Sequence, residues 1–313
     1  MNGICFLFPG QGSQKVGMGQ DLALNFKKAK DVFETASEIF NFNLLKKCTE
    51  ASQEEINNPK ISNAAIVATS IAAFEIVKEN GIFPEFLAGH SLGQYASLYA
   101  AEVLNLEETF KIVKLRVKAF ENTKQEKECG MCAIINAPLE EIEKACKNAS
   151  SYVVCANHNT PTQTVISGEL TAIKEVCEKL QQIAKRCVIL NVPNAFHSEL
   201  MLNAALVFKK SIETFNFKPP KTKIFSNITA KIIEETENFK ELLVKHITSP
   251  VLFKQTLQNL NKENVSTFLE LGQGTTLSSF VNKTLENKNV LSVSNKESLT
   301  KTLNFFSRVS SNE

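Results

Sequence analysis

The pentapeptide Gly89-His90-Ser91-Leu92-Gly93 constrains the fold more than any other feature of this 313-residue chain. It follows a short apolar run, Phe86 to Ala88, and opens the apolar stretch Leu92 to Ala101, which predicts a helix. A Gly-x-Ser-x-Gly sequence between a strand and a helix is typical of a nucleophile elbow, where glycines two residues either side of the serine avoid a steric clash. A simple turn is the alternative interpretation, but this context favours a catalytic Ser91.

Residues 131–191 have a pattern of apolar segments that differs from the rest of the chain. Its apolar patterns predict a βαββαβ order, as in the ferredoxin-like split βαβ unit, with strand 131–136, helix 138–147, strand 152–156, turn 157–161, strand 163–167, helix 170–184 and strand 187–191. The flanking segments alternate helices, such as 61–80, with short strands near 4–8, 86–88, 223–226, 266–271 and 290–293. We therefore expect an α/β fold: a large α/β-hydrolase-like domain, residues 1–122 and 195–313, with an inserted small ferredoxin-like domain, residues 123–194.

A serine nucleophile needs a base within hydrogen-bond reach, and the chain has four histidines. His90 neighbours Ser91 and points to the opposite side of the chain, which favours a packing or anchoring role. His158 falls in the predicted polar turn, where a solvated side chain is the simplest interpretation. His246 is near a helix end, where a charged imidazole would favour the helix dipole. Chain order and position favour His197, at the predicted return to the large domain.

The acidic residues limit how that base can be oriented. Only two of the 33 acidic residues are aspartates, Asp21 and Asp31, so no aspartate follows Ser91. The partner of the base must then be a glutamate, an amide oxygen or a backbone carbonyl, and we favour the carbonyl. This departs from the usual Ser-His-Asp set, although a triad is defined by geometry and role.

Two further segments could complete the site. The loop Pro9 to Gln14 follows the first strand and fails as a phosphate loop, because Lys15 stands where a glycine is needed. Its simplest interpretation is a tight turn, and its functional one is that Gln11 and Leu92 supply the N–H donors of an oxyanion hole. Arg116 is one of only three arginines among 35 basic residues, and it offers the bidentate fork that suits a carboxylate.

Charge and cysteine content exclude some alternatives. The net charge of +2 gives no reason to expect a nucleic-acid partner, and the longest uncharged apolar stretch, Phe86 to Ala101, is too short for a membrane span. Without a signal-like start, the eight cysteines are expected to be reduced core thiols of a cytoplasmic protein. Cys129-Gly130-Met131-Cys132 has redox spacing but stands alone, so we assign it no function. No metal site is expected.

Together these segments resemble the malonyl-CoA:acyl carrier protein transacylase family of fatty-acid synthesis along nearly the whole chain. The resemblance rests on Phe8 to Gln14, Gly89 to Gly93, Leu115-Arg116, Asn157 to Pro161 with Gln163, Val165 to Gly168, Ala195 to Ser198, Ser226-Asn227 and Glu270 to Gly274. The sequence departs from the family pattern at Gln94, where glutamate is usual, at His246, where glutamine is usual, and at Pro193-Asn194, where Ser-Gly is more usual.

The resemblance implies roles for these residues. Ser91 would take the malonyl group with His197 as base and then acid, Gln11 and Leu92 would form the oxyanion hole, and Arg116 would pair with the malonyl carboxylate. Phe196 resembles the malonyl-selective pattern, and His90 belongs to the expected substrate site. In this family a main-chain carbonyl from the segment matching His246 to Val251 orients the histidine.

The expected reaction is a ping-pong transfer from malonyl-CoA to acyl carrier protein, without a metal or organic cofactor. Three alternatives remain open from sequence. A serine thioesterase or esterase would share the elbow but admit water, a polyketide acyltransferase would share every motif, and a non-catalytic binding protein would keep the fold without forming an acyl-enzyme.

Overall fold

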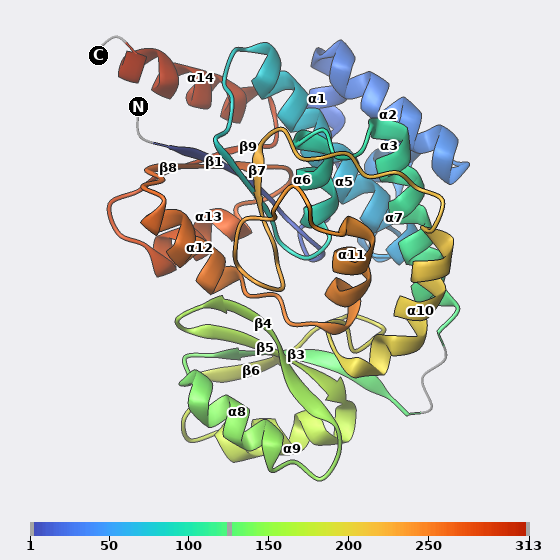
Figure 1. Ribbon diagram of the computed structural model, residues 1–313, viewed down its shortest axis with the longest axis vertical. Coiled ribbons are helices and arrows are strands. Elements are labelled where there is room, and N and C mark those ends of the chain that lie inside the picture. The colour runs from blue at the N-terminus through green and yellow to red at the C-terminus, as the bar shows by residue number, and fades with distance from the viewer. Residues whose placement is uncertain (1–2, 124–126, 311–313) are drawn as a thin grey trace.

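Two separate β-sheets organise the structure, a computed structural model that describes residues 3–123 and 127–310 (Figure 1). The larger sheet is parallel, in the order β7-β2-β1-β8-β9, with β1 (Ile4–Phe8), β2 (Phe86–Gly89), β7 (Lys223–Phe225), β8 (Thr267–Leu271) and β9 (Asn289–Val293). The smaller sheet is antiparallel, in the order β4-β5-β3-β6, with β3 (Cys129–Ile135), β4 (Val153–Thr160), β5 (Gln163–Glu169) and β6 (Arg186–Ile189). The expected α/β fold is confirmed at this level.

Strand β1 lies in the middle of the parallel sheet and is buried on both faces. Its side chains alternate, so that Phe6 and Phe8 join one apolar core while Cys5 and Leu7 join the other. A strand buried on both faces needs a continuous apolar run, which explains the composition of this segment.

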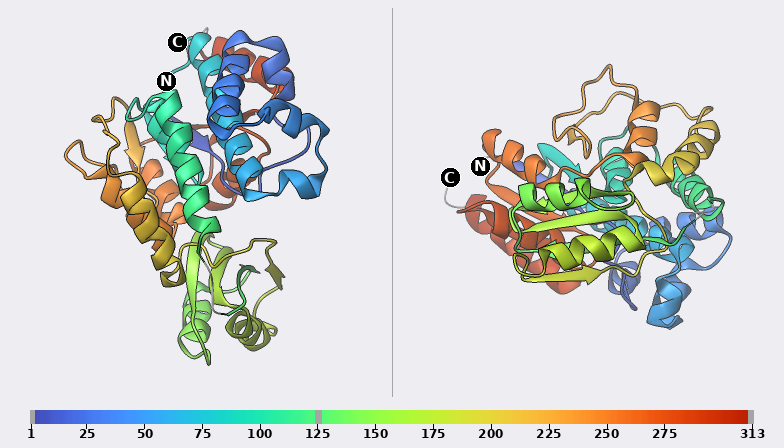
Figure 2. Two further views of the ribbon diagram at one scale, coloured as in Figure 1. Left: turned by 90° about the vertical axis from the view of Figure 1, so that its right-hand side faces the viewer. Right: turned by 90° about the horizontal axis from the view of Figure 1, so that it is seen from below.

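Helices cover both faces of the parallel sheet (Figures 1 and 2). Those that precede the second sheet in the chain are α1 (Gln20–Asn25), α2 (Lys27–Phe40), α3 (Leu44–Glu50), α4 (Gln53–Ile56), α5 (Pro59–Glu79), α6 (Gly93–Ala100) and α7 (Leu106–Glu121). Those that follow it are the 3-10 helix η1 (Glu199–Met201), α10 (Leu202–Ser211), α11 (Phe239–Thr248), α12 (Phe253–Lys262), α13 (Thr276–Thr284) and α14 (Lys296–Ser310).

Helix α5 corrects the sequence-based statement about membrane spans. Its 21 residues are long and apolar enough to cross a bilayer. The sequence analysis considered only the uncharged stretch Phe86 to Ala101 and therefore overlooked this helix. In the structure 89% of its most apolar window is buried against the rest of the protein. The helix is therefore the central helix of the large core, and its composition reflects burial on nearly every side.

The smaller sheet carries helices α8 (Leu139–Lys147) and α9 (Leu170–Leu180) on the face turned away from the parallel sheet, as Figure 2 shows. The predicted βαββαβ order is therefore present. The predicted turn 157–161 is wrong, because β4 continues through these polar residues to Thr160 in pairing with β5. Helix α9 also ends four residues before the predicted limit of 184.

The extension of β4 joins the two parts of the chain. The N–H of His158 donates to the carbonyl of Val251 at 2.9 Å, and the N–H of Val251 donates to the carbonyl of Ala156 at 2.8 Å. His158 is thus half-buried on a strand rather than solvated in a turn, and this contact sets one wall of a pocket between the two sheets.

Candidate active site

Ser91 lies on the tight turn between β2 and α6, with a left-handed φ of 50°. The turn depends on its two glycines. A Cβ at Gly89 would lie 2.2 Å from the carbonyl carbon of Gly93, and one at Gly93 would lie 1.9 Å from the carbonyl oxygen of Phe8. Only glycine fits at both positions, so the elbow interpretation of the pentapeptide has its physical basis in these contacts.

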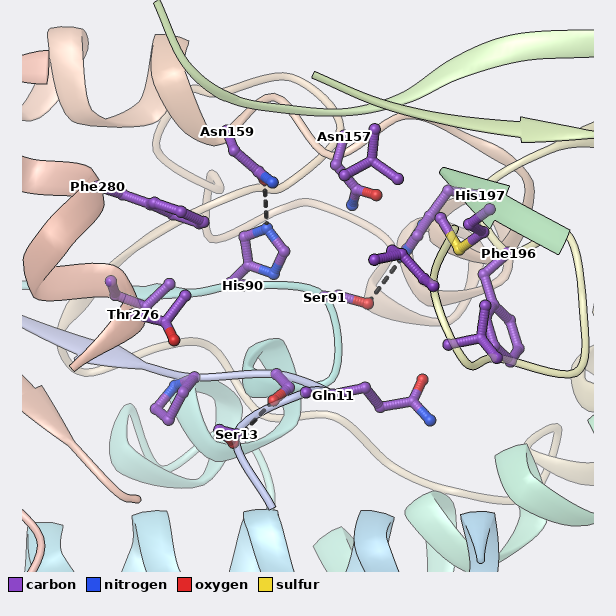
Figure 3. A pocket seen from close by; sticks show the side chains of 18 residues that line it. Gln11, Ser13, His90, Ser91, Asn157, Asn159, Phe196, His197, Thr276 and Phe280 are labelled. Atoms are coloured by element: carbon purple, nitrogen blue, oxygen red, sulfur yellow. Dashed lines mark hydrogen bonds between the residues drawn. The ribbon is translucent and has the colours of Figure 1, made fainter. Parts of the chain in front are cut away.

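The hydroxyl of Ser91 is hydrogen-bonded to His197, with 2.7 Å between Oγ and Nε2 (Figure 3). The other ring nitrogen, Nδ1, lies 2.9 Å from the carbonyl oxygen of His246 and 3.2 Å from that of Ser249. Because carbonyls only accept, Nδ1 carries the proton and Nε2 is free to accept from the Ser91 hydroxyl. The acceptor for Nδ1 of His197 is therefore a main-chain carbonyl, as the scarcity of aspartate suggested.

The imidazole of His197 is neutral at physiological pH. Burial, followed by the positive charge of Arg116, lowers its pKa from the ordinary value to about 3. A neutral imidazole is the form that can take a proton from a hydroxyl.

His246 contributes its backbone rather than its charge. Its side chain is buried, and burial together with the neighbouring His197 holds its pKa well below the ordinary value. The interpretation of His246 as a charged group favouring the helix dipole is therefore wrong, because the buried ring is neutral and cannot complement the end of α11.

Two backbone N–H groups on segments near Ser91 have no partner among the described residues. In the described part of the chain, neither the N–H of Gln11 nor that of Leu92 donates to a protein acceptor. The N–H of Ser91 itself is occupied, since it donates to Oδ1 of Asn227 at 2.8 Å. The loop of Gln11 approaches the elbow closely: a Cβ at Gly10 would lie 2.4 Å from the carbonyl oxygen of His90.

Arg116 is buried on α7, only 3% exposed, and is not among the residues that line the pocket, although Phe120, over which it stacks, contacts the lining residue Phe196. Its Nη1 donates to Oδ1 of Asn63 at 3.0 Å, and its guanidinium stacks 4.4 Å from the ring centre of Phe120. Among the described residues no carboxylate forms an ion pair with it. A buried cation without a counter-ion is costly, and an anionic ligand would relieve that cost.

The pocket collects residues from both sheets. His90 Nε2 lies 2.8 Å from Oδ1 of Asn159 on β4 (Figure 3). Its ring packs against those of Phe253 and Phe280. His90 therefore anchors the small sheet across the pocket. Phe196 also lines the pocket, next to His197, and its ring lies 5.1 Å from that of Phe120.

Asn227 was named from the sequence as part of the family resemblance, without a role of its own. Its side-chain nitrogen donates to the carbonyl of Gly89 at 2.7 Å and to Oε1 of Gln94. It therefore holds both ends of the elbow, and Gln94 occupies the position where the family usually has glutamate. The signal that could have identified it is an asparagine two residues after the end of β7, at the carboxyl edge of a parallel sheet.

The arrangement can perform acyl transfer through a serine ester, because the Ser91 hydroxyl and the neutral His197 share one pocket with Gln11, whose N–H has no partner among the described residues. Among the described residues the single cluster of three potential metal ligands lies elsewhere, in the small sheet. The parallel fold and this pocket together define the class as one of serine acyl-transfer proteins.

Comparison with known proteins names the family. The acyl transferase domain family matches residues 5–303. A malonyl CoA-acyl carrier protein transacylase of Bacillus subtilis is 35% identical over 303 residues, 96% of each chain, and one of Staphylococcus aureus is 32% identical over 90% of this chain and 92% of its own. The solved transacylase of Clostridium perfringens superposes with a TM-score of 0.94 at 31% identity, covering 98% of both chains. The chain therefore belongs to the malonyl CoA-acyl carrier protein transacylase family, and it is an acyltransferase.

Proposed function

We propose that Ser91 carries a malonyl group from malonyl-CoA to the phosphopantetheine thiol of acyl carrier protein. The observation that carries the proposal is the 2.7 Å contact of Ser91 Oγ with a neutral His197. His197 removes the hydroxyl proton as Oγ attacks the thioester carbon, and the N–H groups of Gln11 and Leu92 hold the oxyanion. The protonated His197 then gives its proton to the CoA sulfur as the C–S bond breaks.

The second half-reaction uses the same groups in reverse. The carrier thiol enters where CoA left and gives its proton to His197 as its sulfur attacks the malonyl ester. His197 returns that proton to Ser91 Oγ when the ester bond breaks. The chain supplies every proton transfer, and the proposal requires no metal or organic cofactor.

Arg116 is the proposed partner of the free malonyl carboxylate. The guanidinium is buried, lacks an acidic partner among the described residues, and already uses Nη1 to bind Asn63. Its remaining donors can form a charge-assisted pair with a carboxylate that enters past Ser91. Phe196 and His90 shape the same pocket, so they would limit the size of the acyl group.

Acyl carrier protein is the proposed second substrate. A related malonyl-transacylase, 30% identical with a TM-score of 0.93 over 96% of this chain and 99% of its own, was solved in complex with a type II polyketide acyl carrier protein. Several other relatives are named for malonyl transfer to acyl carrier protein. The proposed role is to supply malonyl groups for fatty-acid elongation, and the proposed location is the cytoplasm.

The finer architecture is part of the proposal. The strand order β4-β5-β3-β6 supports the ferredoxin-like description of residues 123–194, and the elbow on a parallel sheet supports the hydrolase-like description of residues 1–122 and 195–313. Three parts of these proposed domains lie outside the described residues: 1–2, 311–313, and 124–126 beside the proposed boundary.

Mass spectrometry of the acyl-enzyme tests the function. Incubation with malonyl-CoA should add one malonyl group to the peptide containing Ser91, and Ser91→Ala should abolish it. Ser13→Ala is the matched control: Ser13 lines the same pocket, but its hydroxyl donates to the carbonyl of Gly10 at 2.8 Å and meets no histidine. An adduct that persists in Ser91→Ala would refute the assignment.

The fate of the ester separates the alternatives. A transferase should retain the malonyl-serine in water until holo-acyl carrier protein removes it, whereas a thioesterase would release free malonate without a carrier. Transfer rates to a fatty-acid carrier and to a polyketide carrier distinguish the two pathways. A protein that binds the carrier but never forms the ester would be a binding protein only.

A further inference from the structure

Three cysteines that are far apart in the chain meet in the small sheet. The sulfur atoms of Cys132, Cys177 and Cys187 all lie within 4.8 Å of one another, and those of Cys132 and Cys177 are 3.5 Å apart. Cys132 is fully buried, while the other two are half-buried, so that the cluster is open to solvent on one side. Soft metal ions require such an entry path and such donors.

The strand pairing explains the convergence. In the antiparallel pair of β3 and β6, Cys132 lies opposite Ile189 and Ile134 lies opposite Cys187. Cys132 and Cys187 therefore share one face of the sheet. Helix α9 packs on that face through the core that includes Ile134 and Cys132, and it brings Cys177 over them.

The Cys-x-x-Cys spacing in the sequence is not the relevant pair. Cys129 and Cys132 are three residues apart on β3, so their side chains point to opposite faces of the sheet. The thiol of Cys129 donates to the carbonyl of Lys127 at 3.3 Å instead. Cys132 finds its thiol partners across the sheet and on the helix.

We propose that Cys132, Cys177 and Cys187 form a three-thiolate site for a soft metal ion, with Cu(I) as the fitting ion. The donors are sulfur only, which selects soft ions over Mg²⁺ or Ca²⁺. A structural zinc site needs four ligands, and in residues 3–123 and 127–310 the cluster contains three. Each Cu–S bond replaces an S–H bond, the protons pass to the buffer, and no electron is transferred.

Binding through thiolates has a measurable consequence. A cysteine binds a metal ion as its thiolate, so uptake of the ion releases thiol protons. The apparent affinity for the ion should therefore rise with pH.

The site is separate from the malonyl pocket. Met131 and Val165 belong to the core shared with the parallel sheet and line the pocket, whereas Cys132 and Ile166 belong to the core beneath α8 and α9. The two cores lie on opposite faces of the small sheet. Loss of the thiols should therefore leave malonyl-serine formation intact, which gives an independent check on folding.

Competition with a chromogenic Cu(I) chelator tests the proposal on the full chain, reduced with a non-thiol reductant under anaerobic conditions. Wild type should retain one Cu(I) per chain and show a thiolate-to-copper absorption band. Cys177→Ser and Cys187→Ser should each weaken retention by about tenfold or more. Cys129→Ser is the matched control, because it removes a cysteine from the same strand but the opposite face, and it should bind as wild type does.

Three results would overturn the proposal. Wild type could lose Cu(I) to the chelator as readily as Cys177→Ser does. Cys129→Ser could weaken retention as much as the cluster variants. Zn(II) could be retained in a parallel titration while Cu(I) is not, which would reject the three-coordinate assignment. If Cys177→Ser fails to form the malonyl ester or to fold by circular dichroism, the half-exposed Cys187→Ser decides the outcome.

Discussion

Asn227 accepts a hydrogen bond from the backbone N–H of Ser91 at 2.8 Å while donating to the carbonyl of Gly89 at 2.7 Å. One side chain therefore spans the turn that presents Ser91, the proposed nucleophile. It also occupies the N–H of Ser91, so that the N–H of Leu92 is the elbow donor left for an oxyanion. We infer that Asn227 is a positioning residue.

Asn227→Ala should lower kcat for malonyl transfer by about tenfold or more, because small displacements of a nucleophile are costly, with little change in KM. It should also lower the free energy of unfolding by about 1–3 kcal/mol, since it leaves buried backbone groups unpaired. Steady-state kinetics and denaturant unfolding measure the two effects.

Asn227→Asp separates positioning from stability. The carboxylate keeps the acceptor for Ser91 but loses the donor to Gly89 and Gln94. Its kcat should fall between those of wild type and Asn227→Ala. A purely structural role would instead give stability losses without any fall in kcat at temperatures where the variants are fully folded.

Arg116→Ala should remove the preference for malonyl over acetyl donors. A buried ion pair that loses one partner typically costs on the order of 2–5 kcal/mol, and this loss should appear in kcat/KM for malonyl-CoA but not for acetyl-CoA. Lys118→Gln on the exposed face of the same helix is the control and should change neither rate. Equal activity of the unmutated protein on both donors would contradict the role of Arg116.

The fold was predictable where a local sequence pattern reflects a steric or packing requirement of the structure. Glycine spacing around Ser91 and the alternation of apolar segments between 131 and 191 identify the elbow and the βαββαβ order. The strand through His158 was missed because its polar composition is typical of a turn. Its conformation is set by pairing with β5 and with Val251, and such tertiary contacts override local propensity.

The site was predictable in its residue types and less so in its contacts. Counting aspartates excluded the usual third member of the triad and left a backbone carbonyl among the alternatives, and the structure places the carbonyl of His246 there. Three contacts join residues that are far apart in sequence: Ser91 with His197, Asn227 with the elbow, and Cys132 with Cys177. No local pattern encodes those distances.

Removing the charge of Arg116 should also change the pH dependence of acylation. Burial is the main cause that lowers the pKa of His197 to about 3, and the Arg116 charge is the second. The base works when neutral, so the rate falls as pH drops through this pKa. Arg116→Gln should therefore move that acid limb to higher pH.

Acetyl-CoA is the donor for this measurement, because it carries no carboxylate to neutralise Arg116 in the wild type. Pre-steady-state acylation rates between about pH 3 and 8 cover the range from the wild-type limb, at about 3, to an ordinary histidine pKa near 6.5. Lys118→Gln again serves as control, since it removes one positive charge from the surface of α7. Coincident profiles for wild type and Arg116→Gln would contradict the electrostatic coupling.

His246→Gln should preserve activity and change how stability depends on pH. The carbonyl of residue 246, which orients His197, is main chain and is kept in the variant, and glutamine can replace the ring packing of His246, whose centre lies 5.1 Å from that of His197, so malonyl transfer should stay within a few-fold of wild type. The buried ring has its pKa held well below the ordinary value, so the folded state lacks a proton that the unfolded chain binds below about pH 6.5. Wild-type stability must therefore fall as pH drops through that range, with about 1.4 kcal/mol per pH unit from this one histidine. In His246→Gln the slope of the unfolding free energy against pH, between about pH 4 and 6, should be smaller by that amount. Urea unfolding at several pH values measures this slope. Equal slopes for wild type and variant would show that the ring is not buried and neutral.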